Sequence, residues 1–134
     1  QKNPFDFLSA LDPDISSKGF NPFCGDEIIL SIKLDSNGKS ECILFEGQGC
    51  SISQASASML TELLSNKHLD ELKRISYLFR SMMRGENLSS SEMSLIEGLE
   101  VLEGVRKFPI RIKCALLAWA ALEDGIEEYS VKNS

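Results

Sequence analysis

The sequence predicts an α+β fold in which a small antiparallel β-sheet carries α-helices packed on one face. Two patterns predict it: residues 27–34 alternate between apolar and polar side chains, and apolar residues recur at helical spacing from residue 51 onward. The 134 residues, of which 43% are hydrophobic and 25% charged, suit one globular unit. We therefore expect a single domain spanning residues 1–134.

The strands are expected in the first third of the chain. Residues 1–20 contain two prolines and no sustained period, so we expect an extended lead-in there with at most one turn. The apolar positions of the following strand share its inner face: Ile28, Leu30, Ile32 and Leu34. Asn37 and Gly38 tolerate the positive φ of a tight hairpin. A second strand should then run from about Lys39 to Glu46, with Ile43 and Phe45 facing inward.

Two helices are expected after the second strand. The first begins beside Cys50, and its apolar stripe consists of Ile52, Ala55, Met59 and Leu63. The serines of this helix are interpreted as a thin helix face rather than as nucleophiles. The second helix ends near Gly85, and its apolar positions are Leu72, Ile75, Phe79 and Met82.

Two further helices complete the prediction. Ser89 and Glu92 have the spacing of a capping box, which indicates that a third helix begins there and runs to a C-terminal cap at Gly104. The last helix begins at about Pro109, where the missing N–H is tolerated. Because that helix is apolar around its whole circumference, we expect it at the centre of the fold.

The charge balance excludes several function classes. The formal net charge is -6 at pH 7, and no basic stripe is present of the kind that nucleic acids or anionic membranes require. The apolar run from Cys114 to Leu122 is far shorter than the roughly 20 residues that cross a bilayer. The first residues do not resemble a secretory signal. We therefore expect a cytoplasmic protein with neither a nucleic-acid nor a membrane partner.

The four cysteines allow two disulfides or a site made of reduced thiols, and the lack of a secretion signal favours reduced thiols. Cys24 and Cys50 lie in turn-forming contexts of small residues, while Cys114 lies near the start of the last helix. Asp26 follows Cys24 by two positions, so both side chains can point the same way at the end of a strand. No Cys-x-x-Cys spacing is present, so a shared site would have to be assembled from distant segments.

Three thiolates and one carboxylate match the four ligands of tetrahedral zinc, or the cysteine-rich set of an iron–sulfur cluster. Lys113 and Arg111, close to Cys114 in sequence, would offset the negative charge of such a site. The alternative interpretation is that Asp26 caps a turn and that the cysteines are small buried hydrophobic residues. Cys42, in the second strand, and His68, at a helix start, are expected to serve packing and charge pairing.

Three segments together resemble the iron–sulfur cluster assembly scaffold family that comprises IscU, SufU and the N-terminal domain of NifU. They are NPFCGDEI around Cys24, FEGQGCSISQASASM around Cys50 and KFPIRIKCALLAW around Cys114. The resemblance covers residues 21–125. Two features resemble the SufU type: an extra stretch, residues 82–103, and Lys113 at the position where IscU-type chains carry a histidine.

The resemblance implies a site and a function. The metal ligands would be Cys24, Asp26, Cys50 and Cys114, with Zn²⁺ as the cofactor. Cys24 would accept persulfide sulfur from a pyridoxal-phosphate cysteine desulfurase once ligand exchange frees it, with Asp26, Lys113 and Arg111 in support. The alternative is a non-enzymatic scaffold that builds a transient [2Fe–2S] cluster or binds iron, and passes the product to downstream proteins. Relatives usually carry an N-terminal helix, which we expect to be absent or trimmed here.

Overall fold

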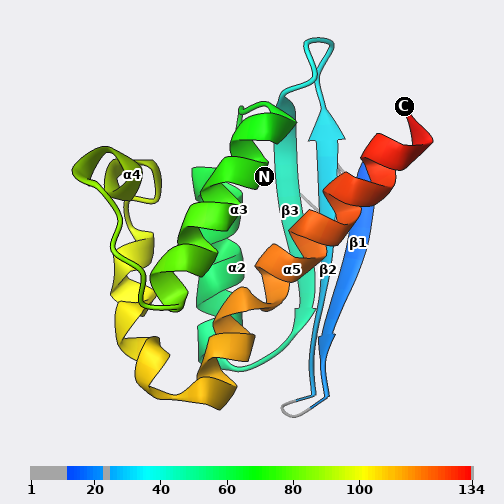
Figure 1. Cartoon of the computed structure of the whole chain (residues 1–134). Helices are drawn as coiled ribbons and strands as arrows, with labels where there is room; N and C mark the ends of the chain where they lie inside the picture. The colour runs from blue at the N-terminus through cyan, green and yellow to red at the C-terminus, as the bar shows by residue number, and fades with distance from the viewer. Residues whose placement is uncertain (1–11, 23–24, 134) are drawn as a thin grey trace, which may run out of the picture.

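The computed structural model describes residues 12–22 and 25–133. An antiparallel sheet of order β1-β2-β3 contains β1 (Ile15–Asn21), β2 (Asp26–Leu34) and β3 (Ser40–Gln48). The helices that follow are α2 (Ser51–Leu63), α3 (Leu69–Met83), α4 (Ser90–Leu95), the 3₁₀ helix η1 (Leu99–Lys107) and α5 (Pro109–Lys132). Figure 1 shows the helices in front of one face of the sheet, so the predicted α+β fold is confirmed.

The predicted strands and hairpin are confirmed. The side chains of Ile28, Leu30 and Ile32 are buried, whereas Leu34 is half-buried where the pairing with β3 shifts register. In the hairpin, one carboxylate oxygen of Asp35 accepts hydrogen bonds from the backbone N–H groups of Asn37 and Lys39, each 2.9 Å long. These bonds close the tight turn that the Asn-Gly pair predicted.

The N-terminal prediction was wrong for residues 15–20, which form most of strand β1. Its inward positions are Ile15, Ser17, Gly19 and Asn21, and only Ile15 has a large apolar side chain, so no apolar alternation marks the strand. Gly19 permits a close approach of α5, because a Cβ atom there would lie 3.0 Å from the carbonyl oxygen of Leu117. Residues 1–11, and with them the expectation about an N-terminal helix, lie outside the described residues.

Helix α2 buries a different face from the predicted stripe. Its buried residues are Ser53, Ser56, Ala57 and Leu60, while the predicted stripe is half-buried. These small side chains let α2 approach α5 closely. The buried hydroxyl of Ser56 keeps its hydrogen bonds in this interface. It donates to the carbonyl of Ala115 at 2.5 Å and accepts from the indole N–H of Trp119 at 3.0 Å.

The predicted third helix, from Ser89 to Gly104, was wrong beyond its first turns. The capping box is confirmed, since Ser89 and Glu92 exchange hydrogen bonds of 2.8 and 3.2 Å. Helix α4 ends at Leu95, and Gly98 then takes a φ of 99°, which an α-helix cannot contain. Leu99 and Leu102 bury their side chains from η1 at the three-residue spacing that suits a 3₁₀ helix.

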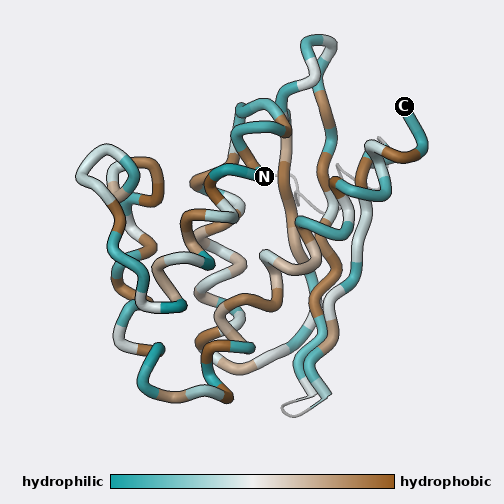
Figure 2. Tube along the Cα trace, in the orientation of Figure 1, coloured by the Kyte–Doolittle hydropathy of each residue, from teal (hydrophilic) through white to brown (hydrophobic). Residues whose placement is uncertain are grey.

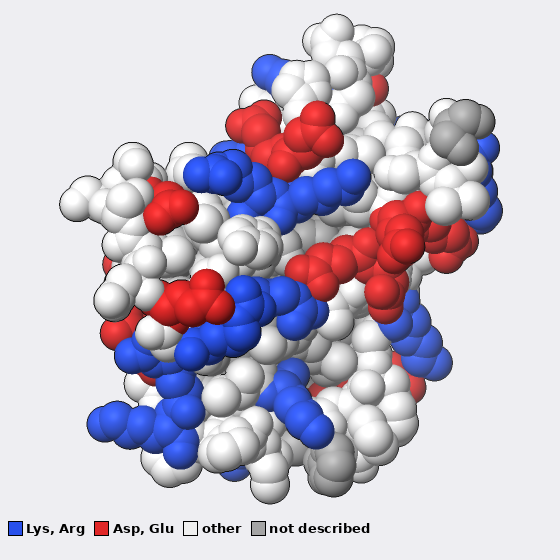
Figure 3. Space-filling view, in the orientation of Figure 1, with Lys and Arg blue, Asp and Glu red and all other residues white. Residues whose placement is uncertain are grey.

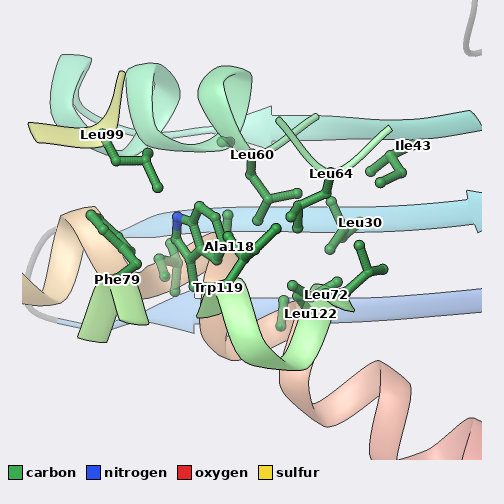
Figure 4. Close-up of a cluster of buried hydrophobic side chains, with 14 of the residues drawn as sticks. Leu30, Ile43, Leu60, Leu64, Leu72, Phe79, Leu99, Ala118, Trp119 and Leu122 are labelled. Atoms are coloured by element: carbon green, nitrogen blue, oxygen red, sulfur yellow. The ribbon is translucent and has the colours of Figure 1, made fainter. Parts of the chain in front are cut away.

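Helix α5 lies at the centre of the fold, as predicted, and packs against β1, β2 and α2. Figure 2 shows that its N-terminal half is the more hydrophobic part and its C-terminal half the more hydrophilic. Trp119 contacts Phe79 of α3, with ring centroids 4.9 Å apart, inside the cluster drawn in Figure 4. Within residues 12–22 and 25–133, none of the helices has the length and apolar character that spanning a membrane requires.

Candidate metal centre

Three of the four predicted ligands converge at one end of the sheet. Asp26 is the first residue of β2, Cys50 is the N-cap of α2, and Cys114 lies in the second turn of α5. One carboxylate oxygen of Asp26 and the two sulfur atoms all lie within 4.8 Å of one another. Asp26 and Cys114 are buried and Cys50 is half-buried, so the cluster is reached from its Cys50 side.

The carboxylate of Asp26 is only half satisfied. Its Oδ1 accepts a hydrogen bond of 3.1 Å from the backbone N–H of Cys50, which fastens the start of α2 to the start of β2. Its Oδ2 is buried and has no hydrogen-bond partner among the described residues. Burying a carboxylate oxygen without a hydrogen-bond partner lowers the free energy of unfolding, by up to about several kcal/mol when the group is charged. A cation coordinated at this oxygen would remove that cost, so the environment of Asp26 fits a metal ligand.

The environment of Cys50 favours its thiolate. Burial raises the pKa of its thiol, but hydrogen bonds from the backbone N–H of Ser53, from the Cys114 side chain and from the N–H of Ile52, together with the nearby Ser53 side chain, lower it by more. The net pKa lies below the ordinary cysteine value. The N–H groups belong to the first turn of α2, so the start of this helix favours the thiolate form of Cys50.

Asn21, which sequence reasoning missed, contacts Cys114, the third predicted ligand of the cluster. Its side-chain amide donates to the sulfur of Cys114 at 3.8 Å, and the exposed fraction of Asn21 is only 4%. An N–H donor next to a buried thiolate stabilises the negative charge on sulfur. Asn21 is the last residue of β1, so the unpredicted strand is what brings it to the site.

Gly49 has no side chain, and this leaves room for the side chains of Ser53 and Asp26 next to the loop. A Cβ atom at this position would collide with the hydroxyl oxygen of Ser53 and lie 3.1 Å from the carboxylate carbon of Asp26. The hydroxyl of Ser53 is itself held, because it donates to the carbonyl of Cys50 at 3.0 Å. The loop before α2 can therefore lie directly on Asp26 only with glycine at residue 49.

Of the residues still to be placed, Cys24 was predicted as a ligand, Lys113 and Arg111 as supporting cations, and Cys42 as lying outside the site. Cys24 lies outside the described residues. Cys42 is half-buried in β3, outside the ligand cluster, and burial together with Glu41 raises its pKa. Lys113 and Arg111 are exposed on α5, and Lys113 lines a hollow of about 430 Å³ together with Asn21.

The donor set of Asp26, Cys50 and Cys114 suits a borderline metal ion. Two sulfur atoms and one carboxylate oxygen are three of the four ligands that zinc accepts in tetrahedral geometry. The same thiolates are typical ligands of iron–sulfur clusters. The orphaned Oδ2 of Asp26 and the lowered pKa of Cys50 both favour a bound cation.

The model of the NifU-like N-terminal domain matches residues 7–134. The chain belongs to this family. The resemblance inferred from the three cysteine segments is thereby confirmed, and the NifU-like domain covers each of the three segments in which the predicted ligands lie.

Proteins of two named functions are similar to this chain in sequence. The zinc-dependent sulfurtransferase SufU of Bacillus subtilis (strain 168) is 46% identical over 125 residues, which cover 93% of this chain and 82% of that protein. The iron–sulfur cluster assembly scaffold protein IscU of Streptococcus pyogenes serotype M1 is 44% identical over 108 residues, covering 80% of this chain and 65% of that protein.

A solved structure agrees with the fold of this NifU-like domain. It is the iron–sulfur cluster assembly scaffold protein for the SUF system from Fervidobacterium islandicum AW-1, with a TM-score of 0.80 and 30% identity. The match covers 86% of this chain and 82% of that chain. The arrangement of sheet and helices is therefore the arrangement of this family.

Proposed function

We propose that the chain is a SufU-type iron–sulfur cluster assembly protein that binds zinc and accepts persulfide sulfur from a pyridoxal-phosphate cysteine desulfurase. The observation that carries this proposal is the convergence of Asp26, Cys50 and Cys114, whose ligand atoms lie within 4.8 Å of one another. The 46% identity to a zinc-dependent sulfurtransferase supports the choice of metal and of chemistry.

The proposed zinc ligands are Asp26, Cys50 and Cys114, with Cys24 as the fourth. Zinc, when bound, would keep its cysteine ligands in the thiolate form without any redox chemistry of its own. A carboxylate is a harder ligand than a thiolate, so Asp26 is the member of this set most open to exchange. The buried Cys114 and the helix-bound Cys50 would hold the metal while the site changes.

The proposed transfer step needs one thiolate and no added oxidant or reductant. The Cys24 thiolate attacks the terminal sulfur of the desulfurase persulfide, and a new S–S bond forms on Cys24 while the S–S bond on the desulfurase breaks. The desulfurase cysteine leaves as a thiolate, so sulfur moves with no net change in electron count. The cationic side chains of Lys113 and Arg111 would stabilise the anionic sulfur species near α5 by charge.

A second function remains a candidate because of the same donor set. Thiolates at Cys50 and Cys114 can also ligate an iron–sulfur cluster, and the relative in Streptococcus pyogenes is named as a cluster assembly scaffold. In that case the partners would be the desulfurase and the iron–sulfur proteins that receive the cluster. Sulfur transfer and scaffolding predict different amounts of zinc, iron and sulfide bound to the purified protein.

Anaerobic purification followed by metal analysis and a desulfurase assay separates the two functions. Sulfur transfer predicts one zinc per chain and a higher turnover of a cysteine desulfurase when the protein is added. Iron and sulfide with a cluster absorption spectrum, and no stimulation of turnover, would support the scaffold instead. The matched variants are Cys24→Ala, which should abolish stimulation, and Cys42→Ala, which should leave it near the wild-type rate. An equal loss in both variants would contradict the proposed acceptor.

A further inference from the structure

Three arginines surround a hollow on the outer side of α5. The hollow has a volume of about 600 Å³ and lies between the end of α3, η1 and the first half of α5. Arg80 and Arg84 come from α3 and its C-cap, and Arg106 from η1. Ile112 and Leu116 line it from α5. The hollow therefore combines an apolar lining with three permanent positive charges.

A second hollow of about 430 Å³ shares Arg80 and Leu116 with the first. It is lined further along by Lys113, by Ala120 and by Asn21, whose amide contacts the sulfur of Cys114. We use the name arginine groove for the two hollows together, defined by Arg80, Arg84, Arg106, Ile112, Lys113 and Leu116. The arginine groove thus ends beside the metal centre.

The charge on this face is divided. Figure 3 shows many Lys and Arg side chains over its lower half, further basic and acidic side chains together in its upper half, and Asp and Glu side chains gathered along the C-terminal half of α5. The protein as a whole carries a net charge of -6, so its general field repels anions. An acidic partner would therefore meet basic side chains at the arginine groove and like charge along the neighbouring acidic half of α5.

The three arginines retain binding capacity although each already contacts a glutamate. Arg80, Arg84 and Arg106 pair with Glu123, Glu86 and Glu103 at 2.7, 2.7 and 3.2 Å. All six side chains are at least 30% exposed, and such pairs contribute little net free energy. A guanidinium has five N–H donors, so each arginine can donate to a second carboxylate or exchange the first.

The floor of the arginine groove limits the shape of its occupant. Ile112, Leu116 and Ala120 follow one another at intervals of four residues, and all three are half-buried. Eight residues of helix rise about 12 Å, which about four residues of an extended peptide span. A short extended segment with an apolar side chain at its middle and carboxylates around it would match both the floor and the arginines.

We propose that the arginine groove binds an extended, acidic segment of a partner protein, with an apolar side chain on the floor of the groove. The occupant is inferred from charge and shape alone, so it does not depend on which chemistry the metal centre performs. Binding there would hold the partner beside Asn21, whose amide contacts the sulfur of Cys114.

The test is a fluorescence anisotropy titration with two labelled peptides, Asp-Glu-Leu-Glu-Asp and its neutral analogue Asn-Gln-Leu-Gln-Asn. We expect the acidic peptide to bind the full chain at least about tenfold more tightly, an advantage that shrinks as salt is added. Amide NMR shifts on binding should centre on Gly85 and Leu116. Equal affinity for both peptides, or shifts elsewhere, would overturn the proposal.

Two double variants of equal net charge provide the control. R84Q/R106Q removes two arginines of the groove, whereas K18Q/R74Q removes two exposed cations that lie outside it. We expect R84Q/R106Q to abolish the preference for the acidic peptide and K18Q/R74Q to preserve it, with circular dichroism confirming that both variants fold. Equal losses in both would show a general charge effect and overturn the proposal. It would also be overturned if a single-stranded oligonucleotide bound the groove more tightly than the peptide, or if the groove mediated self-association in sedimentation experiments.

Discussion

Two buried polar clusters on α2 and α5 differ in one respect that separates structure from function. In the first, the Ser56 hydroxyl donates to Ala115 and accepts from Trp119, so donor and acceptor are both used. In the second, Asp26 uses Oδ1 for the N–H of Cys50 and leaves Oδ2 buried without a partner among the described residues. The first cluster is complete within the described residues, whereas the second leaves one carboxylate oxygen there open to a ligand.

The difference shows how a buried polar group can be interpreted. A satisfied group such as Ser56 stabilises one packing arrangement of two helices. An unsatisfied carboxylate lowers stability, and its persistence next to two cysteine sulfurs indicates a cation site. If this interpretation holds, variants of the two clusters should affect different measured quantities.

The largest expected effect comes from Asp26→Asn. The amide keeps the size of the side chain but removes the charge, so we expect zinc affinity to fall by more than about a hundredfold, beyond the effect of losing an outer-shell partner. The free energy of unfolding of the zinc-free protein should stay equal or rise, because an unpaired buried charge is removed. Competition with a chelating dye and urea denaturation measure the two quantities. Unchanged zinc affinity would remove Asp26 from the ligand set.

Ser56→Ala should show the opposite behaviour. The variant leaves the indole N–H of Trp119 buried without an acceptor, so we expect the free energy of unfolding to fall by about 1–3 kcal/mol. Zinc affinity should match that of the wild type, because Ser56 contacts none of the ligands in the hydrogen bonds of the described residues. Loss of zinc binding together with stability would show that the two clusters are coupled.

Gly49→Ala tests the space beside Asp26. The added Cβ atom would lie against Ser53 and Asp26, so we expect zinc affinity to fall about tenfold, the effect of roughly 1.4 kcal/mol. Gly104→Ala is the matched control, because a Cβ atom there would have no neighbour within 4 Å. Equal zinc affinities of the two variants would contradict the close contact at Gly49.

The smallest expected effect is a difference in titration between two half-buried cysteines. The pKa of Cys50 is lowered, so its thiolate persists to lower pH, whereas the pKa of Cys42 is raised and its thiolate appears only at higher pH. In zinc-free protein, alkylation of Cys50 by iodoacetamide should therefore reach half of its maximal rate at a lower pH than alkylation of Cys42. Mass spectrometry of peptides measures both rates. The reverse order would mean that burial dominates at Cys50.

The sequence predicted the residues that converge at the candidate site better than the residue that contacts them from β1. Asp26, Cys50 and Cys114 stand beside strong local signals, namely an alternating strand, a glycine pair before a helix, and a helix that begins with proline. Asn21 was missed because β1 places Gly19 and Asn21, rather than apolar residues, on its inner face. Its position depends on pairing with β2, a contact between strands that local periodicity does not encode.

The helices show the same limit. Predictions from apolar spacing were right for α3 and α5, whose buried faces are apolar. They were wrong for α2, because close packing against α5 selected Ser53 and Ser56 for burial over the larger Ile52 and Met59. The break at Gly98 was missed because an isolated glycine is tolerated within a helical pattern.

The central claim is that Asp26, Cys50 and Cys114 bind one metal ion. X-ray absorption at the zinc edge of the zinc-loaded protein tests it most directly. We expect a sulfur-rich shell at about 2.3 Å with one oxygen ligand at about 2.0–2.2 Å, and loss of that oxygen contribution in Asp26→Asn. A shell of nitrogen and oxygen alone, or a spectrum that Asp26→Asn leaves unchanged, would contradict the claim.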